Sequence, residues 1–203
     1  MNSLVNRVTP GITAMIRMDH SHVLALLRRY KPNISRGRKS ALVTNACLAL
    51  QIHAQLEEEL FYPELRTLMG DDPVLQKSQP EHDEMRRLIE ELRRRITEGA
   101  IGDPDFDKTF LDLMRIVFHH VADEETQLLP AADRLMGDRS VQLGAEMTRR
   151  RVELMKPHAT DLAVSAARSF PAGAALLAAG ALAIGVALLP RVRKPSRRLM
   201  LRR

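Results

Sequence analysis

The sequence predicts an all-α protein: an up-down-up-down antiparallel four-helix bundle with an extra C-terminal helix and a single transmembrane helix. Apolar residues recur at helical spacing along most of the 203 residues, and no sustained alternation of period two appears. Leu, Ala, Met, Arg and Glu are abundant, whereas Trp is absent and Tyr occurs twice, which favours helices over strands. Breaks rich in Gly, Pro and Asp separate the periodic stretches.

Four long helices are expected in order along the chain, each ended by such a break. Their approximate spans are 11–29, 37–69, 74–98 and 105–136. Short connections between long amphipathic helices make neighbours antiparallel, as in a bundle. Residues 138–168 have the pattern of a further polar helix with a break near Pro157. The predicted domains are a bundle over 11–137, a helical connector over 138–169, a membrane-spanning helix over 170–190 and a basic tail over 191–203.

The C-terminal region separates from the bundle by its charge. Residues 191–203 carry seven cations, which leaves a net charge of −1 on residues 1–190 out of a total of +6, so nucleic acid is not an expected partner. Residues 170–190 are 21 residues without a charge, about 30 Å of helix and roughly the thickness of a bilayer core. We predict that residues 170–203 bind a membrane; the alternative is a buried Ala/Gly-rich core helix. Ala181 and Gly185 have a spacing that allows two such helices to pair, so a homodimer is compatible with the sequence.

The expected location is the inner face of a bacterial-type inner membrane, with the bundle in the cytoplasm. The N-terminus has no secretory signal pattern, and the single Cys47 excludes an internal disulfide. A basic tail should remain on the cytoplasmic side, which conflicts with a tail that crosses the membrane from a cytoplasmic bundle.

The most informative feature is an internal repeat of the form H-x3-E-E-x4-P. It begins at His53 and at His120, on the second and the fourth predicted helix. A His and a Glu four residues apart lie on one face of a helix, so His53 with Glu57 and His120 with Glu124 are expected to face the same interior position. A carboxylate in a core must be paired, protonated or bound to a metal, and no Lys or Arg recurs beside both copies.

The other two helices each supply one more histidine preceded by an acid, Asp19-His20 and Glu81-His82. A lone core-facing His is usually structural, but one on each of four helices, two of them with Glu, indicates a metal centre. Imidazole and carboxylate donors without thiolate suit iron, manganese or zinc, and two carboxylates able to bridge favour a dinuclear iron centre. The Glu-x-x-His motif of ferritin-like bundles and the His-Glu-x-x-His motif of zinc proteases are both absent.

This order of motifs resembles the hemerythrin HHE cation-binding family over about residues 11–137. The resemblance implies two non-haem iron ions, with Mn or Zn as weaker alternatives, and the two glutamates as bridges. It implies six ligands: His20, His53, Glu57, His82, His120 and Glu124. It also implies binding of O2 or a related small ligand, peroxide or NO, in redox chemistry or in oxygen or iron sensing.

The resemblance leaves the reaction open. Oxygen carriers of this family have a fifth His one turn from the third-helix ligand, where this chain has Ser78 and Arg86, four residues before and after His82. An open or water-filled position on one iron therefore shifts the expectation from oxygen carriage toward reaction or sensing. The alternatives are an enzyme that removes peroxide or nitric oxide or repairs iron–sulfur clusters, a metal-dependent sensor or structural bundle without turnover, and a bundle without metal.

Several neighbours of the predicted ligands are open choices. His119 is an alternative to His120, which we prefer for its apolar neighbours, and His22 is expected on the surface. Asp19 and Glu81 are interpreted as exposed acids rather than partners of a ligand, and Tyr62 and Phe61 as core or rim residues. Glu58 and Glu125 fit either hydrogen-bond acceptors for the ligands or helix-surface charges.

Overall fold

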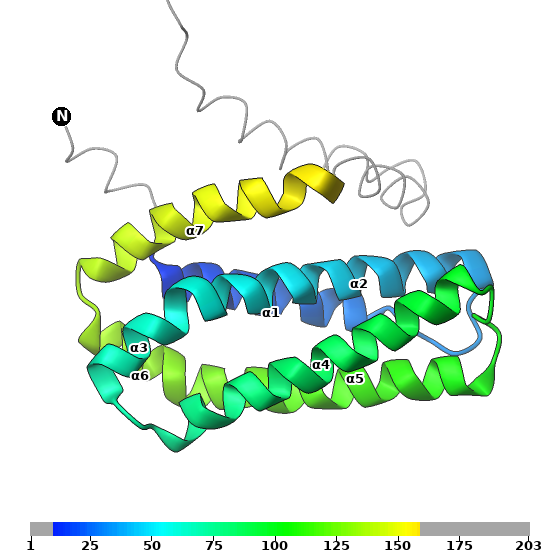
Figure 1. The fold of residues 1–203 in the computed structure, drawn as a ribbon, viewed down its shortest axis with the longest axis horizontal. Coiled ribbons are helices and arrows are strands. Elements are labelled where there is room, and N and C mark those ends of the chain that lie inside the picture. Colours follow the sequence, from blue (N-terminus) through cyan, green and yellow to red (C-terminus); the bar gives the residue numbers. More distant parts are fainter. Residues whose placement is uncertain (1–9, 159–203) are drawn as a thin grey trace, which may run out of the picture. The chain divides into compact units, whose positions relative to one another are not determined.

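The structure, a computed structural model, describes residues 10–158 as a helical bundle with one additional helix (Figure 1). The α-helices are α1 (Ile12–Arg28), α2 (Arg36–Leu56), α3 (Tyr62–Met69), α4 (Pro73–Thr97), α5 (Pro104–Asp123), α6 (Leu129–Leu135) and α7 (Arg139–Met155). Two π-helical turns, η1 (Glu57–Phe61) and η2 (Glu124–Leu128), join α2 to α3 and α5 to α6, and a 3-10 turn, η3 (Lys156–His158), follows α7.

The four long helices form two antiparallel pairs, α1 with α2 and α4 with α5, and α2 also packs on α4 (Figure 1). The start of α4 is fixed by Asp72, whose carboxylate accepts hydrogen bonds from the backbone N–H groups of Val74 and Leu75 at 2.9 and 3.2 Å. Helices α3 and α4 end at Gly70 and Gly99, which have positive φ angles of 64° and 77°.

The two π-helical turns correct the prediction of uninterrupted second and fourth helices. The backbone N–H of Tyr62 donates to the carbonyl of Glu57, five residues back, and Leu129 pairs with Glu124 in the same way. Both turns lie just before a proline, Pro63 or Pro130, near the start of the next helix. A proline ring collides with the carbonyl four residues back in a regular α-helix, and a wider turn relieves that collision.

Two apolar clusters fill the bundle, one on each side of a polar layer. The first cluster lies at the end of the bundle that holds the C-terminal ends of α1 and α4. It includes Val23, Leu50, Met85, Phe110 and Val117. The second lies toward α3 and α6, and it includes Ile16, Leu56, Phe61, Leu65 and Leu128. The predicted ligand residues lie between them, so the polar layer has a hydrophobic core above and below it.

Helix α7 packs against α1 and α2, on the opposite side from α4 and α5 (Figure 1). Gly144 allows this close approach, because a Cβ atom at that position would lie 2.1 Å from the carbonyl oxygen of Pro10. The expected polar helix after the bundle is therefore present as α7, which ends at Met155, and the turn η3 at Lys156–His158 lies at the break expected near Pro157. The rest of that predicted span, residues 159–168, lies outside the described residues.

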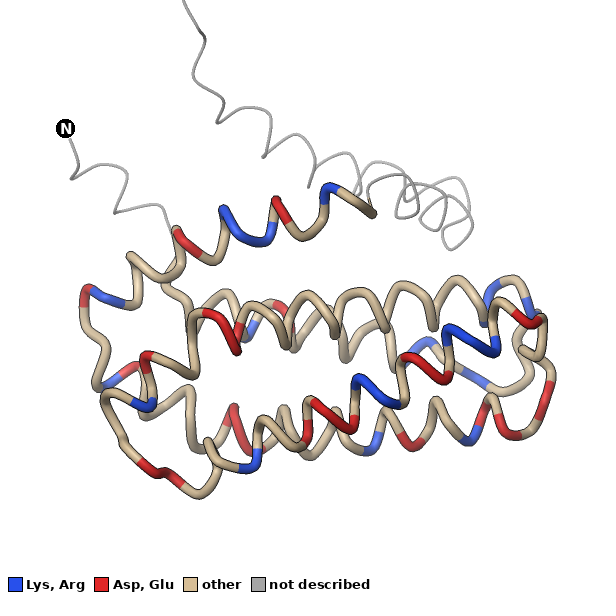
Figure 2. The backbone as a smooth tube through the Cα atoms, in the orientation of Figure 1, with Lys and Arg blue, Asp and Glu red and all other residues tan. Residues whose placement is uncertain are grey.

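The predicted fold class is wrong in including a transmembrane helix. Among residues 10–158, no helix has both the length and the apolar character needed to cross a membrane. Along α4 both signs of charge alternate and form Arg–Glu pairs one turn apart (Figure 2). The segment 170–190, to which the span was assigned, lies outside the described residues.

Candidate metal centre

The six predicted ligand residues meet in the polar layer between the two apolar clusters. Both glutamates have no exposed surface, and the four histidines are 1–4% exposed. One group of donor atoms that could hold a metal comes from His20, His53, Glu57 and Glu124, and a second comes from Glu57, His82 and His120; within each group the atoms lie within 4.8 Å of one another. The folded chain therefore offers two adjacent metal positions.

The two carboxylates lie between these positions. Oε2 of Glu57 is 3.3 Å from Nε2 of His53 and 3.5 Å from Nε2 of His82. Oε2 of Glu124 is 3.1 Å from Nε2 of His20 and 3.5 Å from Nε2 of His120. Each glutamate thus contacts one histidine of each half, which is the placement that a bridging carboxylate requires.

All four histidines face the centre through Nε2 and face a carboxylate through Nδ1. Nδ1 lies 2.7 Å from Glu125 for His20, 2.8 Å from Glu58 for His82 and 2.9 Å from Glu81 for His120. For His53 the partner is Asp19, at 3.6 Å. The interpretation of Asp19 and Glu81 as exposed acids is wrong, because each partners a histidine on a different helix. Such carboxylates orient metal-binding imidazoles and raise their basicity.

Alternatives left open by the sequence are resolved by burial. His120 is buried and His119 on the same helix is exposed, since only His120 lies on the interior face of α5. His22 is exposed, as expected. Phe61 belongs to the core, as expected.

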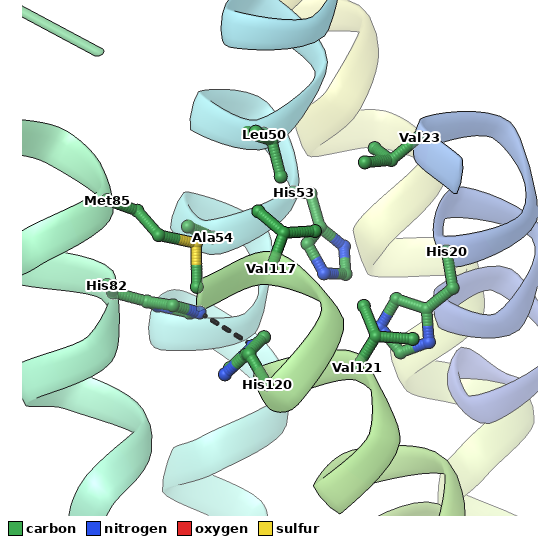
Figure 3. A pocket seen from close by; sticks show the side chains of 10 residues that line it. All are labelled: His20, Val23, Leu50, His53, Ala54, His82, Met85, Val117, His120 and Val121. Carbon is green, nitrogen blue, oxygen red and sulfur yellow. Dashed lines mark hydrogen bonds between the residues drawn. The ribbon is translucent and has the colours of Figure 1, made fainter. Parts of the chain in front are cut away.

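On the side away from the glutamates, the four histidines bound a small apolar cavity (Figure 3). Its volume is about 10 Å³, close to the space that one water molecule needs. The rest of its lining is apolar: Val23, Leu50, Ala54, Met85, Val117 and Val121. The cavity therefore has room for about one water-sized molecule beside the four histidines.

Comparison with known proteins agrees with this geometry. A sequence profile described as the hemerythrin HHE cation binding domain matches residues 11–132, more than half of the chain. The chain belongs to the hemerythrin HHE family. This hemerythrin-like protein is also 31% identical over 121 residues to a protein of Nostoc sp. (strain PCC 7120) described as a DNA nickase. That match covers 60% of this chain and spans 33% of the length of the relative. No solved structure matches the chain.

Unpaired polar atoms in the core support metal binding by this hemerythrin-like protein. Both ring nitrogens of His53 and Oε1 of Glu57 are buried and have no hydrogen-bond partner in the structure. Such atoms destabilise a fold unless something binds them, and a cation at the centre would satisfy Nε2 of His53 and Oε1 of Glu57, while Nδ1 of His53 faces Asp19 instead. The donor set of nitrogen and oxygen without sulfur fits iron, manganese or zinc.

The charges of the site influence one another strongly. Burial opposes the charged form of His120, but Glu124 and Glu57 outweigh this effect and raise its pKa to about 10. Burial likewise opposes the charged form of Glu124, and the surrounding histidines lower its pKa. Without metal, His120 and Glu124 therefore stabilise each other as ions, and metal must displace a proton from His120.

Tyr62 is a site residue that sequence reasoning assigned to the core or rim. Its hydroxyl donates to Oε1 of Glu124 at 2.8 Å and lies 3.3 Å from Oε2 of Glu57 and 3.4 Å from Nε2 of His82. The η1 turn accounts for this position, because a π-helical turn brings residue 62 onto the face of Glu57. A comparison of the two copies of the repeat could have identified this residue. The position before the proline is a polar tyrosine, Tyr62, in the first copy and an apolar leucine, Leu129, in the second.

The positions one turn before and after His82, where oxygen carriers of the family have a fifth histidine, hold Ser78 and Arg86 in this chain. Ser78 is buried, and its hydroxyl donates to the carbonyl of Val74 at 3.0 Å. Arg86 points outward and donates to Glu58 at 2.8 Å. The Tyr62 hydroxyl lies 3.4 Å from Nε2 of His82, on the side of the ring that faces the centre.

Proposed function

We propose that this protein is a non-haem di-iron protein that binds O2, peroxide or NO in the cavity beside the histidines. The cavity is the observation that carries the proposal: it is buried, apolar, limited to about one small molecule, and bounded by all four predicted histidine ligands. His20 and His53 would hold one iron, His82 and His120 the other, and Glu57 and Glu124 would bridge them. Bound iron would supply reversible one-electron chemistry toward the small ligand.

The chain's own residues prepare the site for such a ligand. The carboxylates beside Nδ1 of His20, His82 and His120 keep Nε2 of these three rings directed at the centre. The apolar side chains around the cavity exclude water, which strengthens electrostatic interactions at the centre. Tyr62, on the opposite side, holds the carboxylates by hydrogen bonds.

Metal analysis combined with optical spectra under air and under argon tests this proposal on the full chain. Two irons per chain and an absorption band that depends on oxygen are expected. Fewer than about half an iron per chain after anaerobic reconstitution would contradict it. Two zinc or manganese ions with no response to any of the three ligands would support the metal-dependent structural bundle instead.

Turnover of peroxide or nitric oxide is the second candidate, and Tyr62 favours it. A phenol at the centre, with a proton shared with Glu124 at 2.8 Å, is a suitable proton donor for a bound oxygen species. Oxygen evolution from peroxide, or consumption of nitric oxide, by the iron-loaded protein would distinguish turnover from simple binding.

DNA nicking by this chain is not favoured. It is suggested by the description of the Nostoc relative, of which the shared region is a third. Residues 10–158 contain 22 Lys and Arg against 24 Asp and Glu, a net charge of −2, which does not favour a polyphosphate. Incubation of the iron-loaded chain with supercoiled plasmid tests this: persistence of the supercoiled form is expected.

A further inference from the structure

Helix α7 lies outside the region matched by the family profile and holds the bundle through two consecutive arginines. Arg150 donates to both carboxylate oxygens of Glu59, at 2.6 and 2.9 Å. Arg151 donates to both carboxylate oxygens of Asp19, from Nη2 at 2.6 Å and from Nη1. In both ion pairs one arginine donates to both oxygens of a carboxylate. Only the carboxylate of Asp19 also faces a predicted metal ligand.

Asp19 is the carboxylate that faces the predicted ligand His53. It lies 3.6 Å from Nδ1 of His53, whereas the corresponding distances for the other three histidines are 2.7–2.9 Å. Both ring nitrogens of His53 lack a hydrogen-bond partner in the structure. His53 is therefore the one predicted ligand whose outer nitrogen is not held by its carboxylate.

Competition from Arg151 explains the longer distance. A bidentate guanidinium occupies lone pairs on both oxygens of a carboxylate and neutralises its charge. Glu58 provides the comparison. Arg86 donates to Oε1 of Glu58 alone, and this same oxygen stays 2.8 Å from Nδ1 of His82. A single arginine contact therefore leaves the imidazole in place, whereas Arg151 engages both oxygens of Asp19. A carboxylate held in this way by arginine is a weaker acceptor for the imidazole N–H, so the imidazole donates less electron density to a metal.

We propose that Arg151 of α7 is a positioning residue that holds Asp19 away from His53 and so raises the reduction potential of the iron bound by His20 and His53. The inference rests on the proposed di-iron function and adds a helix outside the family profile to the determinants of that centre. We expect α7 to affect the potential of this iron and not that of the iron bound by His82 and His120. The carboxylates beside those two histidines, Glu58 and Glu81, bond to residues of the bundle.

Potentiometric titration of the iron-loaded full chain tests the proposal, with release of iron to a chelator as a second readout. In Arg151→Gln, Asp19 is free to bond to His53, and the midpoint potential should fall. In Asp19→Asn, the acceptor loses its charge, so the potential should rise and one iron should leave about tenfold faster. Both substitutions break the same ion pair. Shifts of the midpoint potential in opposite directions would therefore show that the hydrogen bond from His53 to Asp19, and not the ion pair itself, sets the potential.

Arg150→Gln is the matched control, because it removes an equivalent ion pair of α7 that does not involve a ligand's partner. Its potential should equal that of the unaltered chain. Arg151→Lys keeps the charge without the bidentate geometry, so a smaller fall than in Arg151→Gln is expected, and it carries the test if Arg151→Gln does not fold.

Two results would overturn the inference: shifts of the same sign in Arg151→Gln and Asp19→Asn, or a shift in Arg150→Gln equal to that in Arg151→Gln. Either would show that α7 acts only by packing. Failure of the unaltered chain to hold iron would refute the proposed function and this inference together, whereas two irons with unshifted variants would refute the inference alone.

Discussion

Glu57 is the residue on which both metal positions depend. Its carboxylate is fully buried, contacts His53 and His82, and has one oxygen without a partner. Burial of a carboxylate is unfavourable unless a cation or hydrogen bonds compensate it, so a structural role alone does not explain this residue.

We expect Glu57→Ala or Glu124→Ala to reduce bound iron from two per chain to one or fewer, because each removes a donor shared by both positions. Elemental analysis of reconstituted protein measures the loss. His22→Ala, at an exposed position of α1, should retain full iron content. Equal losses in all three variants would contradict the assignment of Glu57 and Glu124 as shared donors.

Tyr62→Phe should leave the core packed and remove one hydroxyl from the centre. We expect iron content to remain near two per chain, while turnover of peroxide falls by about 100-fold if the phenol donates a proton. The optical spectrum and a peroxide assay measure both effects.

Tyr30→Phe is the matched control, because Tyr30 bonds to Asp107 in the first apolar cluster's region, away from the ligands. It should change neither the spectrum nor turnover. An unchanged spectrum and unchanged turnover in Tyr62→Phe would remove Tyr62 from the site's chemistry.

Among the elements, the two π-helical turns decide which face of the helix the residues after Glu57 and Glu124 lie on. We expect Pro63→Ala to allow a regular α-helix through residues 57–63, which would rotate Tyr62 away from Glu57 and weaken iron binding by about tenfold. Chelator competition measures the affinity. Pro73→Ala, at the first position of α4 where no helical hydrogen bond is lost, should have iron affinity like that of the unaltered chain.

The docking of α7 depends on a glycine. Gly144→Ala places a Cβ atom 2.1 Å from the backbone oxygen of Pro10, so α7 must shift, at a cost of about 1–3 kcal/mol in the free energy of unfolding. Gly37→Ala in α2 meets no atom within 4 Å and should stabilise the chain by about 0.5–1 kcal/mol. Urea unfolding of both variants checks the difference, and equal effects would refute the close contact between α1 and α7.

For the whole molecule, the polar layer makes the free energy of unfolding depend on pH, and we expect this dependence to differ between metal-free and metal-loaded protein. Because the pKa of His120 is raised to about 10, the stability it adds is fully present below about pH 6.5 and lost as pH rises toward 10. We expect the free energy of unfolding of metal-free protein to fall from pH 7 to pH 10 in urea titrations, and metal uptake at pH 7 to release protons.

Substitution of His120 provides the control for that prediction. His120→Asn removes the titrating ring, so the decline in stability above pH 7 should become smaller. A metal-free protein whose stability does not change between pH 7 and pH 10 would contradict the coupling between His120 and the two glutamates.

The sequence by itself predicted the four bundle helices and the interior faces of the residues that meet in the polar layer, because these depend on periodicity within single helices; their role as ligands stays a prediction from the family resemblance. His53 and Glu57 share a face owing to a spacing of four, and His20 and His82 lie on apolar stripes. A transmembrane helix was inferred from composition alone, and no described helix supports it.

Tertiary structure decided what one helix places against another. Asp19 and Glu81 look like surface acids on their own helices, and only the packing of α2 and α5 beside them supplies the histidines that they face. Tyr62 reaches the centre because a π-helical turn changes the helical phase, which a repeat of 3.6 residues does not predict. Arg151 lies more than a hundred residues from Asp19 in sequence, so their ion pair exists only because α7 folds back onto α1.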